Sequence, residues 1–442
     1  MGEPMSPRQR ATLDRFLRRK RMHPAAVDCV GVTNAFLQEM ERGLAGAPSS
    51  LPMIPTYIET ARAVPVGEKV IALDAGGTNL RVAVVSFDAQ GKPAIEELTR
   101  HRMPGSDAAI DKAEFFRALA EVVLPVARRA QSIGFCFSYP ADITPEKDGR
   151  LVQFTKEIKA SGVDGELVGA NLVEALVAAG APRPSRIVLV NDTVTTLLAG
   201  RNALPGRRFD DFMGLVCGTG LNAAYVERNE RIRKTPGLDA GGSQIVNTES
   251  GSFGRGVRGE IDDLFDAAMI NPGKYRHEKS ISGAYLGPLC LFTAQCAARE
   301  GCFSPTAARA IADLHALTTH DMNDFLLAPD DPANPLGALC ARIPADDARG
   351  LYVTCESVLE RAAAMVAVNL SAVLLKTEKG RDPRYPVCIA VDGTTFWQLR
   401  GFRGRVESYM RSCLGVRRER AWEITSVQDA PLLGAAIAAL TN

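Results

Sequence analysis

A short glycine-rich turn joins one apolar segment to the next at two places, and this feature limits the fold more than any other. First, VIALD (70–74) is followed by Gly76-Gly77 and then by RVAVVSFD (81–88). Second, GLVCGTGLNAAYVE (214–227) carries Gly218-Thr219-Gly220 between two apolar halves. The flanking segments are rich in β-branched residues and predict strands. The glycines therefore join strand to strand, whereas a Gly-Lys-Ser/Thr nucleotide loop or a dinucleotide fingerprint requires a helix after them.

Further apolar segments predict buried strands, and helical stretches lie between them: IGFCFSY (133–139), IVLV (187–190) and VCIAVD (387–392). Strands that alternate with helices predict an α/β fold. Because the strand–turn–strand pattern occurs twice, we expect two α/β domains of a common plan with a cleft between them. Residues 326–350 contain four prolines and several aspartates and predict an irregular surface segment.

The first 60 residues predict helices followed by a linker. Seven basic residues crowd 8–21, where Asp14 is the only acid. A targeting helix is one interpretation, and a surface helix with a solvated face is the expected one. Prolines at 52, 55 and 65 predict the linker.

Composition excludes several classes of protein. The chain has 52 Lys and Arg against 51 Asp and Glu, so its net charge of +1 argues against binding that neutralises nucleic-acid phosphates. The apolar stretch 362–375 has 14 residues, too few to span a bilayer, and 1–22 lacks the apolar run of a secretory signal. The ten cysteines form no Cys-x-x-Cys pair. We expect a cytoplasmic protein with reduced thiols.

The chemistry of the first turn suits a phosphate. Glycines let backbone N–H groups approach an anion, and Thr78 and Asn79 add side-chain donors. Asp74 is suited to hold Mg²⁺, and Arg81 to balance phosphate charge. A plain tight hairpin is the alternative. The second turn, together with a third strand that ends in Asp392-Gly393-Thr394, favours nucleotide binding.

From about residue 70 to 440 the sequence also resembles the hexokinase family, whose fold is that of the actin-like ATPases. The segments that carry this resemblance follow the family's order: LDAGGTNLRVAVVSFD (73–88), IGFCFSYPADI (133–143), LVQFTKEIKASGVDGELVGANL (151–172), VNDTVTTLLAG (190–200), GLVCGTGLNAAYVE (214–227), IVNTESGSFG (245–254), KSISGAYLGPL (279–289), AVDGTTFWQLRGF (390–402) and DAPLLGAAIAAL (429–440). The resemblance implies a single-unit hexokinase or glucokinase of the bacterial type.

The resemblance also implies a domain organisation. It predicts two actin-like (ribonuclease H-like) α/β domains with an interdomain cleft. The small domain is expected at 67–203, joined by the C-terminal helix 430–442, and the large domain at 204–429. An N-terminal helical segment at 1–66 is expected to pack on the large domain.

Site residues are implied in the same way. The hexose is assigned to a first set: Ser138, Thr155, Lys156, Asn191, Asp192, Asn222 and Glu249. ATP is assigned to a second set, in which Asp74 also holds the metal: Asp74, Gly76, Gly77, Thr78, Asn79, Arg81, Gly218, Thr219, Gly220, Asp392, Gly393 and Thr394. Asp192 is the implied base for the 6-hydroxyl group, and Lys156 neutralises charge during transfer. Taken alone, Asn191-Asp192 could instead simply cap the helix that follows.

Three positions depart from the family pattern. Phe154 and Ser250 stand where the family has Trp, which predicts changes in packing. Pro288 stands where the resemblance places a Glu that contacts the anomeric end of the sugar. Proline has no side-chain acceptor, so we expect the anomeric hydroxyl group to contribute little. The alternative is that a neighbour such as Glu249 covers the gap.

The expected activity is ATP-dependent, Mg²⁺-assisted phosphorylation of the 6-hydroxyl group of a hexose, with glucose as the expected substrate. No nucleic acid, membrane or partner protein is expected to take part. The alternatives are a kinase for mannose, fructose or a hexosamine, and a catalytically weak sugar-sensing protein of the same fold. An actin-like ATPase with a protein partner is a third, but it would not need the hexose set.

Overall fold

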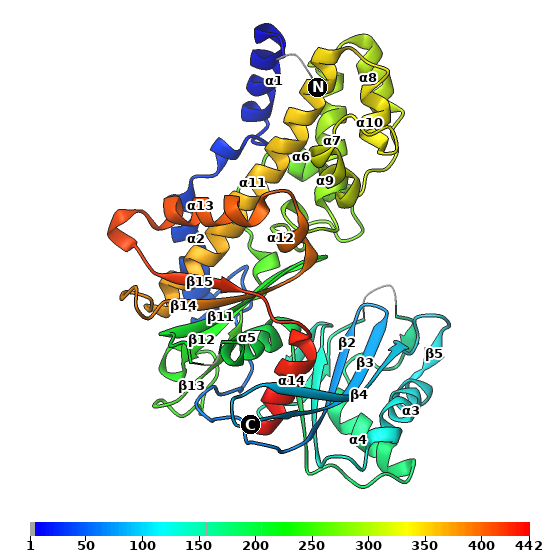
Figure 1. Cartoon of the computed structure of the whole chain (residues 1–442), viewed down its shortest axis with the longest axis vertical. Coiled ribbons are helices and arrows are strands. Elements are labelled where there is room, and N and C mark those ends of the chain that lie inside the picture. Colours follow the sequence, from blue (N-terminus) through cyan, green and yellow to red (C-terminus); the bar gives the residue numbers. More distant parts are fainter. Residues whose placement is uncertain (1–4, 155–157, 205) are drawn as a thin grey trace.

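The computed structural model describes residues 5–154, 158–204 and 206–442, and two large β-sheets organise it (Figure 1). Two helices, α5 (Asp192–Asn202) and α14 (Ala430–Thr441), lie between the sheets. Other helices cover the outer faces of the central strands, which are therefore buried on both sides. This layer between the sheets is the frame to which the rest of the molecule attaches.

The five-stranded sheet has the order β10-β6-β2-β3-β4. Its strands are β2 (Val70–Gly76), β3 (Asn79–Phe87), β4 (Pro93–Arg102), β6 (Ser132–Phe137) and β10 (Arg186–Val190). The first three form an antiparallel meander, and β6 and β10 extend it in parallel. Gly76 pairs with Asn79, so the first glycine turn joins β2 to β3 directly, as the sequence predicts.

The six-stranded sheet repeats this plan with the order β1-β13-β12-β11-β14-β15. Its strands are β1 (Ile54–Pro55), β11 (Asp211–Cys217), β12 (Leu221–Arg228), β13 (Ser243–Asn247), β14 (Val387–Asp392) and β15 (Trp422–Thr425). Again a meander, β11 to β13, is extended by two parallel strands. The prediction of an α/β fold in which one plan occurs twice is confirmed. Two small pairs lie apart: β5 (Ile110–Asp111) with β9 (Ala160–Ser161), and β7 (Ala141–Ile143) with β8 (Gly149–Leu151).

The five-stranded sheet contributes to a different core on each face. Ile71, Leu73 and Ala75 of β2 belong to the core formed with α3 (Lys112–Val123) and α4 (Val168–Ala178). Val70 and Ala72 belong to the core formed with α5 and α14. Side chains alternate across a strand, so a strand that is buried on both faces needs an unbroken apolar run. This requirement explains the run VIALD.

The longest helix described, α11 (Ala345–Thr377), has 33 residues and passes through the core of the half that contains the six-stranded sheet. The uncharged stretch 362–375 does have 14 residues, but it is only part of α11, which continues past the buried residues Arg361 and Lys376, so its length does not exclude a membrane span. The prediction of an irregular segment at 326–350 is wrong in part, since it contains α10 (Pro335–Cys340) and the start of α11. By length and composition α11 could cross a membrane, but 89% of its apolar window is buried inside the protein, as in a core helix.

The N-terminal helices α1 (Pro7–Arg19) and α2 (Cys29–Ala45) both contact α11. In α1 the apolar face is buried, and most of the basic side chains are exposed. The predicted linker is partly a strand, because Pro55 of β1 pairs with Val246 of β13. A proline is tolerated there because β1 is an edge strand.

The remaining helices surround α11 and the outer face of the six-stranded sheet (Figure 1). They are α6 (Glu260–Ala267), α7 (Leu286–Arg299), α8 (Pro305–Ala312), α9 (Thr319–Leu327), α12 (Thr394–Gln398) and α13 (Phe402–Leu414). Short 3-10 turns occur at Pro24–Ala26, Leu124–Val126, Asn229–Arg231, Ser250–Ser252, Glu278–Ser280 and Val416–Arg418.

Glycines allow α14 to pack backbone to backbone against its neighbours. A Cβ atom on Gly434 of α14 would lie 2.1 Å from the carbonyl oxygen of Thr195 in α5. A Cβ atom on Gly134 of β6 would lie 2.0 Å from the carbonyl oxygen of Ala435 in α14. Nonbonded atoms do not approach this closely, so a side chain at either position would force the backbones apart.

We predict that Gly434→Ala lowers the free energy of unfolding by about 1–3 kcal/mol or more, the usual range for an overpacked core. Thermal unfolding of the purified protein measures the effect. Gly404→Ala in α13 is the matched control, because its Cβ would meet no atom within 4 Å and the position is exposed. The control is expected to stabilise the helix by roughly 0.5–1 kcal/mol. Equal melting temperatures for both variants would contradict the predicted packing.

Candidate active site

The second glycine turn is in contact with the end of β14. The carbonyl oxygen of Gly218 accepts hydrogen bonds from Thr395 Oγ1 at 2.8 Å and from the N–H group of Gly283 at 2.7 Å. Gly393 has φ of +116°, and a Cβ atom there would lie 2.3 Å from the carbonyl oxygen of Cys217. Only glycine allows this approach. Two segments that the sequence assigns to ATP, 218–220 and 392–394, are thus in direct contact.

The first glycine turn lies beside the end of β6. Ser138 donates its N–H group to the carbonyl oxygen of Ala75 at 3.0 Å, and Tyr139 donates its hydroxyl group to the carbonyl oxygen of Gly77. Gly77 and Asn79 are exposed at the tip of the turn. The turn is therefore anchored at its base and open at its tip.

Arg81 of β3 is held between two carboxylates. Its Nε donates to Asp74 Oδ2 at 2.8 Å, and its Nη1 donates to Asp429 Oδ1 at 2.7 Å. Asp429 directly precedes α14, so this contact joins the five-stranded sheet to the start of that helix. The sequence singled out Arg81 for phosphate alone and missed its structural partner Asp429.

Asp192 is the first residue of α5, and it directly follows the Asn191 that caps the helix. Asn191 Oδ1 accepts the N–H group of Thr193 at 2.9 Å. The cap is therefore made by Asn191, and the Asp192 carboxylate accepts a hydrogen bond from Thr193 Oγ1 at 3.2 Å. Burial, with contributions from nearby Glu249 and Asp74, raises the pKa of Asp192 to about 7.

Glu249 lies at the end of β13 and is held by two asparagines. Asn247 Nδ2 and Asn222 Nδ2 donate to Glu249 Oε1 at 2.8 and 3.1 Å. Its backbone is left-handed, with φ of +54°, a conformation that costs energy for a residue with a side chain. Burial raises the pKa of Glu249 above its ordinary value. The predicted residues Asn222 and Glu249 are therefore in direct contact.

Glu278 is a site residue that sequence reasoning missed. Its Oε2 accepts the N–H group of Leu221, directly after the second glycine turn, at 2.9 Å. Burial, together with the charges of Glu249 and Asp192, raises its pKa to about 7. The signal in the sequence was slight, since Glu278 directly precedes the segment 279–289 that carried the resemblance.

Pro288 stands where the resemblance places a Glu. It lies in the first turn of α7, where a proline is tolerated. The acid Glu278, ten residues earlier in the chain, lies near Glu249 and Asp192. The loop before α7 therefore places one carboxyl group near Glu249, and the small contribution expected from the anomeric hydroxyl group stays a prediction.

Carboxyl groups from both sheets come within electrostatic range of one another. The charge of Asp74 raises the pKa of Asp192, and that of Asp392 raises the pKa of Asp74, in each case after burial as the larger cause. Among the described residues, no group of three or more His, Cys, Asp or Glu side chains could hold a metal ion. Thr155 and Lys156 lie outside the described residues.

Two family profiles, both described as hexokinase, match residues 13–202 and 212–441. Hexokinase-5 of Oryza sativa subsp. japonica is 31% identical, and the alignment covers 93% of this chain and 86% of the rice protein. Hexokinase-2 of Homo sapiens is 30% identical, with 86% of this chain and 43% of the human protein covered. The chain thus spans less than half of the human relative.

Solved structures share the fold. A hexokinase from Schistosoma mansoni complexed with glucose matches with a TM-score of 0.78 at 24% identity, covering 98% of this chain and 99% of that one. A second hexokinase structure matches with a TM-score of 0.77 at 22% identity over the same shares. The predicted actin-like fold is confirmed.

The expectation of a bacterial-type enzyme is not supported, because relatives of about 30% identity come from plants, a yeast and mammals. The family itself rests on both halves of the sequence and on relatives that share nearly the full length of this chain. The chain belongs to the hexokinase family.

Proposed function

We propose that this protein transfers the γ-phosphoryl group of ATP to the 6-hydroxyl group of a hexose, and that glucose is its preferred hexose. The observation that carries the proposal is the half-buried carboxyl group of Asp192 at the start of α5, which lies near Asp74 of the first glycine turn and near Glu249. A kinase of this type needs a base near an anion site. The hexokinase relatives from rice and human support the same reaction.

The hexose end of the site is assigned to side chains that converge near Asp192. Glu249 and Glu278 supply acceptors for sugar hydroxyl groups, and Asn222 orients Glu249 through its amide. A site that distinguishes hydroxyl groups needs such fixed, partly desolvated partners, because a sugar that cannot satisfy them leaves them unpaired. Ser138 and Asn191 extend this set. Thr155 and Lys156 belong to it on the family resemblance alone.

Asp192 is the proposed general base. Its ionised carboxylate accepts the proton of the 6-hydroxyl group as that oxygen attacks the γ-phosphorus. A desolvated carboxylate is more basic than one in water, and burial of Asp192 has this effect. Thr193 Oγ1 donates to it and orients it. The rest of the rate enhancement comes from alignment and charge neutralisation.

The phosphate end is assigned to both glycine turns. Backbone N–H groups at 76–79 and 218–220 approach the phosphates, and Thr78 and Thr219 add hydroxyl donors. Asp392 and Gly393 lie beside the second turn, and Thr394 is exposed next to them. ATP is thereby held between the two sheets.

Mg²⁺, when bound, neutralises charge on the phosphates. The residues present fit such an ion, since Asp74 is half-buried with Asp392 in electrostatic range, and Mg²⁺ in kinases needs one or two carboxylates besides the phosphates. Asp74 is the proposed holder, directly or through water. Arg81 keeps Asp74 in place, because its guanidinium group donates to that carboxylate.

A division into domains accompanies this function. We assign a small domain to 67–203 together with 430–442, and a large domain to 204–429 with 1–66 packed on it. In support, the strands of the five-stranded sheet fall within 70–190, and α1 and α2 contact α11. The substrates bind in the cleft between the domains. A cytoplasmic location and the absence of a partner protein stay predictions.

An assay of ADP release with a panel of hexoses tests the function. Glucose is expected to give the highest kcat/KM, and mannose, fructose and glucosamine lower values. A preference for one of the others would indicate the alternative hexose kinase. Absence of activity with every hexose, combined with hexose binding, would indicate the sugar-sensing alternative.

We predict that Asp192→Asn lowers kcat by roughly 10²–10⁴-fold, the usual contribution of a positioned base. The substitution keeps the shape of the side chain, so calorimetric binding of glucose without nucleotide is expected to persist. The comparison of kcat with glucose affinity is the measurement. Retention of more than about half of the wild-type kcat would rule out Asp192 as the base.

The pH dependence follows from the pKa of Asp192, which burial raises to about 7. Below that pH the carboxyl group is increasingly protonated and cannot accept a proton. We therefore expect kcat/KM to fall as the pH is lowered through about 7, to about a tenth of its plateau one unit below.

Glu278 provides the control, because its pKa is also raised to about 7 and the two groups interact. Glu278→Gln is expected to lower kcat/KM at every pH but to keep the acid limb. A flat profile between pH 6 and 8 in the wild type would contradict the assignment, in which about a tenfold change is expected.

A further inference from the structure

The two acids assigned to the hexose occupy similar places in their loops. Glu249 is partly exposed between Thr248 and Ser250, both of which are fully buried. Glu278 is partly exposed between His277 and Lys279, both of which are buried. In each loop one carboxylate can reach a ligand while its two neighbours are fixed in the core. The orientation of each carboxylate therefore depends on what holds its neighbours.

Glu249 is fixed from both sides. Thr248 donates its hydroxyl group to the carbonyl oxygen of Ala223 in β12 at 2.8 Å. On the other side, Ser250 Oγ accepts a hydrogen bond from Asn369 Nδ2 of α11 at 2.9 Å, and both partners are 0% exposed. A left-handed residue such as Glu249 persists only when its surroundings hold it. These two contacts supply that restraint.

The hydrogen bond from Asn369 depends on the hydroxyl oxygen of Ser250. The family pattern has Trp where this chain has Ser250, and an indole ring donates a hydrogen bond but accepts none at its nitrogen. The departure at Ser250 is therefore more than a change of packing, because it creates an acceptor for the amide of α11.

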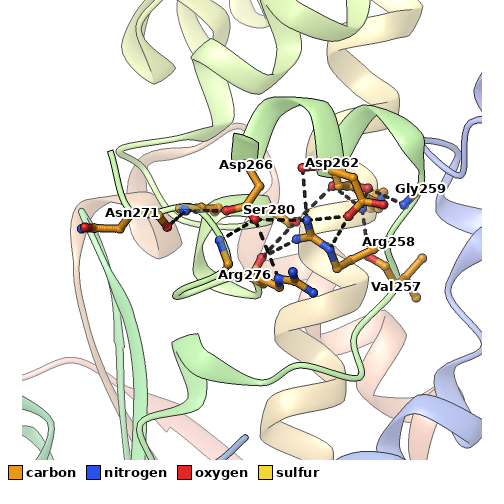
Figure 2. A network of polar contacts seen from close by, with 12 residues as sticks. Val257, Arg258, Gly259, Asp262, Asp266, Asn271, Arg276 and Ser280 are labelled. Carbon is orange, nitrogen blue, oxygen red and sulfur yellow. Dashed lines mark hydrogen bonds and ion pairs between the residues drawn. The ribbon is translucent and has the colours of Figure 1, made fainter. Parts of the chain in front are cut away.

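The residues that directly follow Glu278 belong to a network of buried polar contacts, which Figure 2 shows around Asp262, Asp266 and Ser280. Lys279 pairs with Asp266 of α6 and also donates to the carbonyl oxygen of Asn271. Ser280 Oγ donates to Asp262 Oδ1 at 3.1 Å. Two carboxylates of α6, Asp262 and Asp266, thus hold the segment that directly follows Glu278.

Helix α11 anchors this network as well. Arg361 of α11 is 1% exposed, and its Nη2 lies 2.8 Å from each carboxylate oxygen of Asp262 and 3.0 Å from the carbonyl oxygen of Val257. A buried charge of this kind is costly to leave unpaired, which keeps Asp262 in one position. The chain of contacts therefore runs from Arg361 through Asp262 to Ser280, two residues from Glu278.

The loops also contact each other. His277 donates its N–H group to the carbonyl oxygen of Gly251 at 3.1 Å, and its ring packs against Phe253 and Phe36. The two loops are thus joined by a backbone hydrogen bond, and the His277 ring extends the contact into the core.

We propose that α11 positions the two hexose-binding carboxylates through two buried polar contacts, Asn369 with Ser250 for Glu249 and Arg361 with Asp262 and Ser280 for Glu278. The proposal rests on the proposed function, in which these acids bind the hexose. Residues 361 and 369 lie about two helical turns apart on one rigid element. Asn369, Ser250, Asp262, Ser280 and Arg361 are positioning residues, since none is assigned to touch a substrate.

Ser250→Ala and Ser280→Ala test the proposal in the full-length enzyme. Each removes one hydroxyl group, and each is expected to raise the KM for glucose and its dissociation constant by roughly tenfold, the effect of one lost hydrogen bond. The KM for ATP is expected to change by less than about twofold, because the glycine turns keep their own contacts. A purely structural role would not separate the two substrates.

Thr354→Val is the matched control. Thr354 lies on α11 and is 0% exposed, but its hydroxyl group donates only to the carbonyl oxygen of Gly350 in the same helix. It is expected to lower the melting temperature about as much as the two serine variants and to leave the KM for glucose unchanged.

A double variant tests the link between Asn369 and Ser250 directly. The double variant Ser250→Ala/Asn369→Ala is expected to raise the KM for glucose no further than Asn369→Ala alone, because the two residues act through one bond. If the effects of Ser250→Ala and Asn369→Ala on the KM for glucose simply added, the two residues would not act through one bond and the link would be overturned. An unchanged KM for glucose in both serine variants would overturn it too. An equal rise in the KM values for glucose and ATP would overturn it as well.

The same measurements distinguish a failure of the proposed kinase function from a failure of the positioning proposal. If the wild type phosphorylates no hexose, the function itself fails. If the wild type is active but Glu249→Gln and Glu278→Gln leave the KM for glucose unchanged, the assignment of the acids fails and the positioning proposal fails with it. An active enzyme that is sensitive at both acids but insensitive at both serines would overturn the positioning proposal alone.

Discussion

The whole molecule depends on the close contact of α5 and α14 between the two sheets. Backbone meets backbone there, because Gly434 faces Thr195 and Gly134 faces the carbonyl group of Ala435. The six-stranded sheet joins the same layer, since a Cβ atom on Gly214 of β11 would lie 2.4 Å from a carbonyl oxygen of α5. Interiors are packed without free space, so contacts of this kind fix the spacing of the layers. Each half of the molecule thereby uses the same two helices as part of its core.

This layer also sets the geometry of the site. Asp192 begins α5, and Asp429, which holds Arg81, directly precedes α14. Asp192 and Asp429 thus lie at the starts of α5 and α14. The positions of these two helices are set by the backbone contacts described above. The distance between the proposed base and the first glycine turn thus depends little on flexible side chains. Phosphoryl transfer requires such alignment, because a small displacement of the reacting groups greatly slows the reaction.

The sequence predicted the strands that are buried on both faces, because nearly every residue of such a strand is apolar. The strands beside the glycine turns form unbroken apolar runs, whereas β4 is largely exposed and has no such run to predict it. The length of α11 was underestimated because Arg361 interrupts its apolar run, and only the structure shows that Asp262 pairs with it. The same holds for the site. The family resemblance supplied most candidates, but Glu278 depends on contacts between distant segments, which no local pattern encodes.

The position of α14 in the chain has a consequence for biosynthesis. Strand β6 (Ser132–Phe137) is made early, yet the helix that covers one of its faces, α14 (Ala430–Thr441), emerges from the ribosome hundreds of residues later. Until then the apolar face formed by Val70, Ala72 and Cys136 has only part of its cover. Such delayed, long-range contacts are slow to form and leave nascent chains prone to association. The arrangement that closes the core of the folded enzyme therefore leaves part of that core uncovered in the nascent chain until α14 has been made.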